Sequence, residues 1–118
     1  MDNTVDGNFS DFSSIKLLLV EDLKSYAELA KLEITKGLLD WCDSVGFLRV
    51  DNREEFLQSI SNYKPDIIIS DYMMPHFSGM EVIDLALKFS PSTPIVILTG
   101  SMNEETAVEC MKAGASDY

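Results

Sequence analysis

Basic residues are scarce in this sequence: 9 lysines and arginines stand against 20 aspartates and glutamates, which gives a formal net charge of −11. Nucleic acids and anionic membranes are polyanions, so this acidic segment is not expected to bind either of them directly. Cysteine is equally sparse. Cys42 and Cys110 lack the spacing of a metal site, and we expect both to be reduced thiols in a cytosolic protein.

Long hydrophobic runs are missing as well. No apolar stretch approaches the roughly 18 residues that a membrane span needs. The first residues are acidic and polar, where a signal peptide would be basic and then apolar. These absences predict a cytoplasmic protein. The remaining composition, 46% hydrophobic and 25% charged over 118 residues, suits a single globular domain.

Short apolar runs alternate with amphipathic segments along most of the chain. Residues 1–13 lack any sustained period and predict a flexible tail, followed by one domain over 14–118. Strands are expected over 15–20, 46–50, 66–71 and 94–99, with the start of a fifth at 116–118. Helices are expected over 23–36, 54–63, 79–89 and 103–113.

Three details of this pattern carry further expectations. The strand over 46–50 alternates between apolar and polar residues, so we expect it at an edge of the sheet. The end of the first helix is open, because Gly37 could stop it or the helix could continue to about Asp43. Gly114 is expected to stop the last helix.

The alternation of strands and helices predicts an α/β fold with a parallel sheet covered by helices on both faces. Ligands bind beyond the carboxyl ends of the strands in such sheets. Glu21, Asp22, Asp71 and Thr99 all fall at those ends. Three carboxylates at one edge repel each other, by about 4 kcal/mol for a pair 4 Å apart. A cation among them or a proton on one of them is therefore required.

Four segments in order resemble the receiver domains of bacterial two-component response regulators. They are Val20-Glu21-Asp22, Asp71-Tyr72-Met73-Met74-Pro75 followed by Gly79, Pro94 to Gly100, and Lys112 to Tyr118. The resemblance extends from about Ile15 to Tyr118. It implies the flavodoxin-like doubly wound sheet with strand order 2-1-3-4-5, a fold for which a chemotaxis receiver is a standard example. The fifth strand and fifth helix would be largely missing from this sequence.

The resemblance also implies a chemistry. Asp71 would accept a phosphoryl group from a phosphohistidine donor, forming an aspartyl phosphate. Asp22, Asp71, the backbone carbonyl of Met73 and, through water, Glu21 would hold Mg²⁺, which favours oxygen ligands of this kind. The Met73 side chain would overhang Asp71 and limit access of water. The domain would catalyse only its own phosphorylation and hydrolysis, so it is not expected to be an enzyme acting on other substrates.

A conformational switch is implied by the same resemblance. The Thr99 hydroxyl would hydrogen-bond a phosphoryl oxygen, Gly100 would leave room for that group, and Tyr118 would turn inward as the switch aromatic. A partner that binds only the inward state would then read the signal. The expected phosphodonor is a sensor histidine kinase or a phosphotransfer protein.

Each of these residues also has a purely structural interpretation. Glu21 and Asp22 could simply begin a helix, where its dipole favours acids. Asp71 could be a turn residue, and Thr99 an ordinary β-branched strand end. His76, the only histidine, is expected to be a solvated loop residue. The glutamates at 104, 105 and 109 are expected to form a solvated helix face.

The sequence departs from the receiver pattern in two ways. It stops before the lysine that receivers carry at the end of the fifth strand, so it is either part of a longer regulator or a chain completed by self-association through an incomplete sheet edge. Switching is then expected to be weak in this form. The stretch between Asp22 and Asp71 is also long for the family, with the surplus expected around Leu38 to Ser44.

Other functions are possible for the same architecture. A degenerate receiver would act only as a protein-interaction module. A flavin site is disfavoured, because Glu21-Asp22-Leu23-Lys24 is acidic and lacks glycine where a phosphate would need backbone N–H groups. A haloacid-type phosphatase is disfavoured too, because Met73 leaves no second carboxylate two residues after Asp71.

Overall fold

The computed structural model describes residues 14–38, 42–98 and 104–116. Four parallel strands form one sheet in the order β2-β1-β3-β4. The strands are β1 (Ser14–Val20), β2 (Ser44–Val50), β3 (Ile67–Asp71) and β4 (Ile95–Leu98). The helices are α2 (Lys24–Leu38), α3 (Arg53–Asn62), α4 (Gly79–Phe89) and α5 (Glu104–Ala113). This order confirms the predicted flavodoxin-like class, and β2 lies at an edge as predicted.

The central strands are buried on both faces of the sheet, which explains their continuous apolar sequences. In β1, Leu17 and Leu19 point into one hydrophobic cluster, while Leu18 and Val20 point into the other. The alternation follows from the two-residue period of a strand. A segment with apolar residues on both phases of that period can only be stable between two layers of helices.

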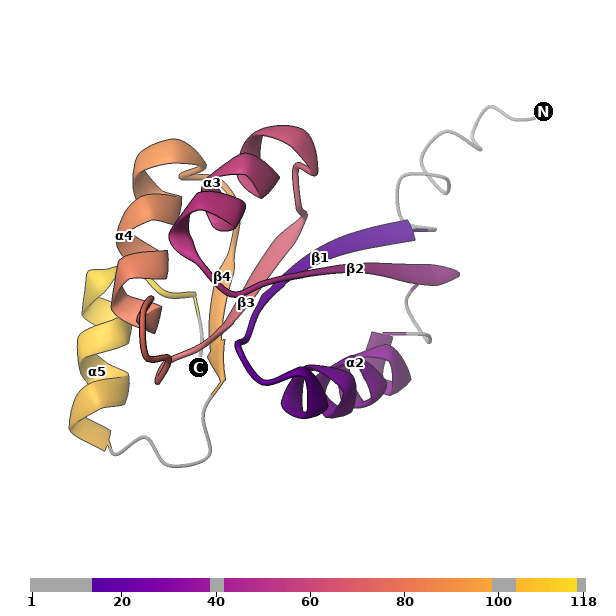
Figure 1. Cartoon of the computed structure of the whole chain (residues 1–118), viewed down its shortest axis with the longest axis horizontal. Coiled ribbons are helices and arrows are strands. Elements are labelled where there is room, and N and C mark those ends of the chain that lie inside the picture. Colours follow the sequence, from indigo (N-terminus) through magenta and orange to yellow (C-terminus); the bar gives the residue numbers. More distant parts are fainter. Residues whose placement is uncertain (1–13, 39–41, 99–103, 117–118) are drawn as a thin grey trace.

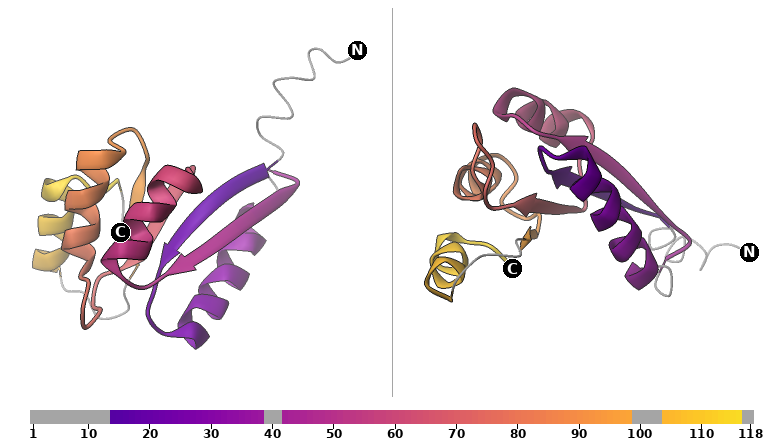
Figure 2. Two further views of the ribbon diagram at one scale, coloured as in Figure 1. Left: turned by 45° about the horizontal axis from the view of Figure 1, so that its top comes forward. Right: turned by 60° about the horizontal axis from the view of Figure 1, so that its bottom comes forward.

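Helices cover both faces of the sheet (Figures 1 and 2). On one face, Ala27 of α2 packs with Leu17, Leu19 and Ile69. On the other face, residues of α3, α4 and α5, among them Phe56, Val82 and Cys110, share a larger cluster with β1, β3 and β4. Within the described residues, α2 is the only helix on its face. None of the helices in this part of the chain has the length and hydrophobicity of a membrane span.

Several boundaries sharpen the predictions. The first helix continues through Gly37 to Leu38, so Gly37 is not its end. Gly114 does end α5, with a φ of 121° that favours glycine. The predicted tail over 1–13 and part of the surplus stretch, 39–41, lie outside the described residues.

The outer edge of β4 meets the last described residue of the chain. The Ser116 backbone N–H donates to the Ile95 carbonyl at 2.7 Å, and the Ile95 N–H donates to the Ser116 hydroxyl at 3.1 Å. The chain therefore enters the fifth-strand position beside β4, while 117 and 118 lie outside the described residues. Beyond this contact, β4 pairs only with β3 in the described part of the sheet.

Candidate functional site

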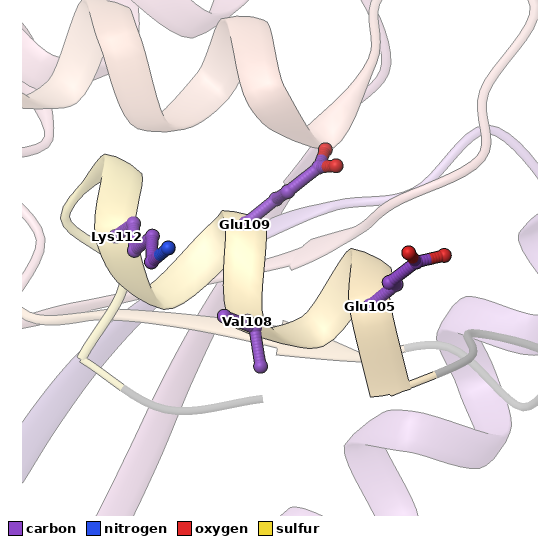
Figure 3. Close-up of a pocket in the computed structure, with 4 residues that line it drawn as sticks. All are labelled: Glu105, Val108, Glu109 and Lys112. Atoms are coloured by element: carbon purple, nitrogen blue, oxygen red, sulfur yellow. The ribbon is translucent and has the colours of Figure 1, made fainter.

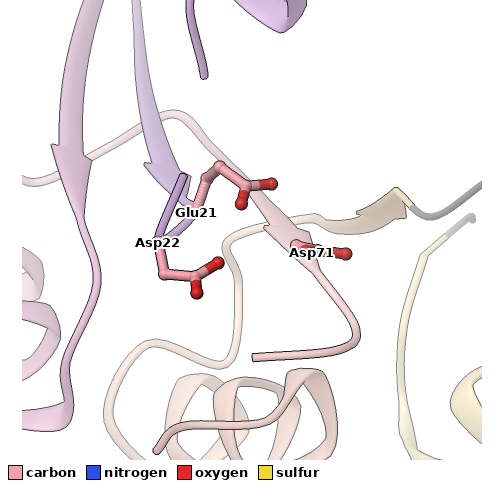
Figure 4. Close-up of side chains that lie close together, drawn as sticks. All are labelled: Glu21, Asp22 and Asp71. Carbon is pink, nitrogen blue, oxygen red and sulfur yellow. The ribbon is translucent and has the colours of Figure 1, made fainter. Parts of the chain in front are cut away.

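Three carboxylates meet at the carboxyl edge of the sheet. Glu21 and Asp22 directly follow β1, and Asp71 is the last residue of β3. Because β1 and β3 are parallel neighbours, with Val20 beside Ser70, their ends bring these acids together. Each offers a carboxylate oxygen, and these oxygens all lie within 4.8 Å of one another (Figure 4). The prediction that the three carboxylates lie together at one edge of the sheet is confirmed.

Burial is the main influence on the protonation of this cluster. It raises the pKa of Glu21, which is 8% exposed, to about 7. The Leu23 N–H, which donates to Glu21 Oε1 at 3.1 Å, acts against this rise in pKa, whereas the charges of Asp71 and Asp22 add to it. Burial also raises the pKa of Asp71, while the backbone N–H groups of Met73 and Tyr72 lower it.

No basic side chain neutralises these acids within the described residues, because the ion pairs there involve other carboxylates. Near neutral pH the cluster must therefore hold either a proton or a cation. Three closely spaced carboxylates that form no ion pair among the described residues offer the oxygen donors that a hard divalent cation requires. The residues present fit a metal site.

The loop that follows Asp71 is held by the interior of the protein. The Gly79 N–H donates to the Tyr72 carbonyl at 2.9 Å, which closes the loop. A Cβ at position 79 would approach the Tyr72 Cα to 2.8 Å, so glycine is required there. Phe77 is fully buried against Phe56 of α3, with ring centroids 5.6 Å apart. The loop is thus fixed at both of its ends.

The helix after this loop begins with a reciprocal pair of hydrogen bonds. The Ser78 hydroxyl accepts from the Glu81 N–H, and the Glu81 carboxylate accepts from the Ser78 N–H. Such a capping box satisfies backbone donors that have no partner within the helix. It fixes the residue at which α4 starts and so restricts the conformation of the loop between Asp71 and α4.

The other predicted residues have separate outcomes. Met73 is 67% exposed, and its predicted carbonyl contact with a metal stays a prediction. Thr99, Gly100 and Tyr118 lie outside the described residues. His76 is exposed, as expected.

A surface hollow on α5 lies away from the acids in the sequence. It is lined by Glu105, Val108, Glu109 and Lys112 (Figure 3). The two glutamates are exposed, in agreement with a solvated helix face. The hollow contains none of the three carboxylates at the sheet edge.

Arg49 is a residue of the site that the sequence interpretation missed. Its Nη1 donates to the Glu21 carbonyl at 2.9 Å. The alternation of apolar and polar residues in β2 already marked Arg49 as a polar position. In the structure Arg49 pairs with Leu19, which lies two residues before Glu21. Only the strand order turns this alternation into a contact.

Comparison with known proteins decides the family. The sequence model described as "Response regulator receiver domain" matches residues 17–118. The chain belongs to this family. It is 35% identical over 100 residues to the regulatory protein LuxO of Vibrio cholerae, covering 85% of this chain and 21% of that protein. It is 26% identical to the chemotaxis protein CheY of Thermotoga maritima, covering 87% and 82%.

Solved receiver structures share the fold. The BeF3-activated N-terminal receiver domain of Klebsiella pneumoniae RstA matches with a TM-score of 0.71 and 26% identity, covering 87% of this chain and 82% of that one. The receiver domain of a Francisella response regulator matches with a TM-score of 0.72 and 26% identity, covering 88% and 81%. This receiver chain spans about a fifth of the length of the LuxO relatives that it matches.

Proposed function

We propose that this receiver domain accepts a phosphoryl group on Asp71 and binds Mg²⁺ through Asp22, Glu21 and Asp71. The observation that carries the proposal is the cluster itself: three carboxylates within 4.8 Å, two of them with raised pKa values and none paired with a base among the described residues. A structural role in starting α2 would not explain why Asp71, from a different strand, completes the group.

The phosphoryl donor would be a sensor histidine kinase or a phosphotransfer protein, since receiver domains of response regulators receive phosphoryl groups from histidine kinases. An Asp71 carboxylate oxygen forms a bond to the phosphorus of a phosphohistidine. The P–N bond breaks, and its electron pair remains on the imidazole nitrogen. The acceptor must be deprotonated for this attack, and burial opposes that ionisation because it raises the pKa of Asp71.

Bound Mg²⁺ would neutralise the charge that builds up as one anion approaches another. The protein contributes the positions of its groups. The Tyr72 and Met73 N–H groups favour the ionised form of Asp71, and the Met73 carbonyl is the further ligand implied by the family. The carboxylates lie at the end of a rigid sheet, so little reorganisation is needed at the moment of reaction.

The signal would leave the site through Thr99 and Tyr118, as the family resemblance implies. In this proposal the protein catalyses only its own phosphorylation and the hydrolysis of its aspartyl phosphate. We place it in the cytoplasm, because histidine kinases draw the phosphoryl group from ATP. The BeF3-activated form of the similar RstA receiver supports a response to phosphoryl-like ligands at this type of site.

Intact mass after exposure to acetyl phosphate and Mg²⁺ tests the acceptor. The wild type is expected to gain the mass of one phosphoryl group, and Asp71→Asn is expected to gain none, because an amide oxygen is a poor nucleophile. Asp84→Asn is the matched control, since it removes the same charge from an exposed position on α4.

Two results would contradict this function. Equal labelling of wild type and Asp71→Asn would place the acceptor elsewhere. No labelling of the wild type, together with no response to beryllofluoride and Mg²⁺, would favour a degenerate receiver that acts only as a protein-interaction module.

A further inference from the structure

Arg49 holds the backbone of the segment that carries two of the acids. It lies near the end of β2, at the edge of the sheet, and its side chain is 31% exposed. Its Nη1 donates to the Glu21 carbonyl at 2.9 Å and lies 3.7 Å from Asp51 Oδ2. The guanidinium thus contacts the loop between β1 and α2 at a main-chain carbonyl and not at a carboxylate.

The same loop residue is held from two further directions. The Glu21 N–H donates to the Val50 carbonyl at 3.0 Å, which extends the pairing of β1 and β2 by one residue. Glu21 Oε1 accepts the Leu23 N–H at 3.1 Å. With the bond from Arg49, the N–H, the carbonyl and the side chain of Glu21 are all engaged. The peptide group that joins Glu21 to Asp22 is therefore held in a fixed orientation.

Arg49 is itself held in place by the start of α3. Asp51 Oδ1 accepts from the Asn52 side-chain amide at 3.2 Å. The Asn52 Oδ1 accepts the Glu55 N–H at 2.9 Å, as the N-cap of the helix. This chain of contacts connects the amino end of α3 through Asp51 and Arg49 to the acidic loop. An arginine restrained in this way loses less conformational entropy when it donates to Glu21.

We infer that Arg49 is a positioning residue for the cation site: by holding the Glu21 carbonyl, it orients the loop so that Asp22 faces Asp71. This inference rests on the proposed function. A positioning role can be distinguished from a simple charge effect, because the two predict opposite changes in Mg²⁺ affinity when Arg49 is replaced. A nearby positive charge disfavours cation binding by Coulomb repulsion, so its removal alone would tighten binding. Loss of a restraint on the loop would weaken binding.

Calorimetric titration with Mg²⁺ tests this inference. Arg49→Gln is expected to weaken binding about five- to tenfold, less than the full effect of a charge-assisted hydrogen bond, because removal of the positive charge acts in the opposite direction. Arg49→Lys is expected to restore part of the affinity, since an ammonium group also donates. Arg53→Gln is the matched control: it removes the same charge from an exposed residue at the start of α3, and binding is expected to be unchanged or slightly tighter. Asp51→Asn is expected to weaken binding less than Arg49→Gln does.

Hydrogen exchange of the metal-free protein supplies a second readout. The amides of residues 21–23 are expected to exchange faster in Arg49→Gln than in Arg53→Gln, while the amides of β3 stay protected in both variants. Unchanged or tighter Mg²⁺ binding by Arg49→Gln, or unchanged exchange of that loop, would overturn the inference.

Failure of the proposed function looks different. In that case the wild type would not bind Mg²⁺, and Asp22→Asn would behave like the wild type. The inference would then be overturned together with the function, whatever the exchange of the loop.

Discussion

The charged side chains at the two ends of the sheet differ in their neighbours, which are hydrogen-bond partners at one end and other carboxylates at the other. At the amino end, Lys16 and Asp66 form two hydrogen bonds with each other. The Lys16 N–H donates to Asp66 Oδ2 at 2.8 Å, and the Asp66 N–H donates to the Lys16 carbonyl at 2.8 Å. The Lys16 ammonium donates to the Tyr63 carbonyl and lies 5.5 Å from the centre of its ring. At the carboxyl end, three acids face one another, and none of their carboxylates forms an ion pair among the described residues.

This difference separates a stabilising region from a functional one. Paired groups at the amino end join β1 to β3 and lower the free energy of the folded state. The carboxyl end raises that free energy until a proton or cation arrives. Such local conflict in an otherwise consistent fold is typical of a site that binds a ligand.

The largest effect is expected from pH at the carboxyl end. The pKa of Glu21 is about 7 in the folded protein and 4.5 as an ordinary glutamate, so between these values the folded state binds more protons than the unfolded state. Stability without metal therefore falls as pH rises from about 4.5 to 7. One pKa unit corresponds to about 1.4 kcal/mol, so the loss is on the order of 3 kcal/mol.

Urea unfolding at several pH values checks this prediction. Glu21→Gln keeps an oxygen that can accept the Leu23 N–H but cannot ionise, so its stability is expected to depend less on pH and to exceed that of the wild type at pH 8. Glu109→Gln, at an exposed position on α5, is the control. An identical pH profile for wild type and Glu21→Gln would remove the basis for calling the carboxyl end destabilised.

The next effect is expected from the cation. At a concentration of 100 times its dissociation constant, Mg²⁺ is expected to raise the free energy of unfolding by about 2.7 kcal/mol, because it binds the folded state only. Thermal unfolding with and without Mg²⁺ measures this gain. Asp22→Asn is expected to lose most of it, and Asp66→Asn at the amino end is expected to keep it. Equal gains in these two variants would show that the acids do not form the site.

The smallest effect is expected at the amino end. Asp66→Asn is expected to lower the free energy of unfolding by about 1 kcal/mol, because the Lys16 N–H loses a charged acceptor. Chemical unfolding at pH 8 without Mg²⁺ gives the comparison with Glu21→Gln. The two substitutions each remove one negative charge, yet they are expected to change stability in opposite directions. If both substitutions changed the free energy of unfolding in the same direction, the proposed difference between the two ends would be wrong.

Much of the architecture was predictable, because burial leaves a regular pattern in the sequence. Leu17 to Val20 and Ile67 to Ile69 are apolar on both phases of the strand period, which indicates helices on both faces. The abrupt change to carboxylates after these runs located Glu21, Asp22 and Asp71. The end of α2 was not predictable in the same way, because Gly37 is compatible with the helix when no backbone contact requires a turn there.

The pattern of burial and polarity is local along the chain, so it was enough to place Glu21, Asp22 and Asp71 at the carboxyl ends of their strands. The burial that raises the pKa of Glu21 to about 7, and the hydrogen bond from Arg49 to the Glu21 carbonyl, arise from the packing of the folded chain. Both depend on strand order, which brings Arg49 and Asp71 close to Glu21 although they lie 28 and 50 positions from it in the sequence. Desolvation and hydrogen bonding act over a few ångströms in space, and no local pattern records such distances.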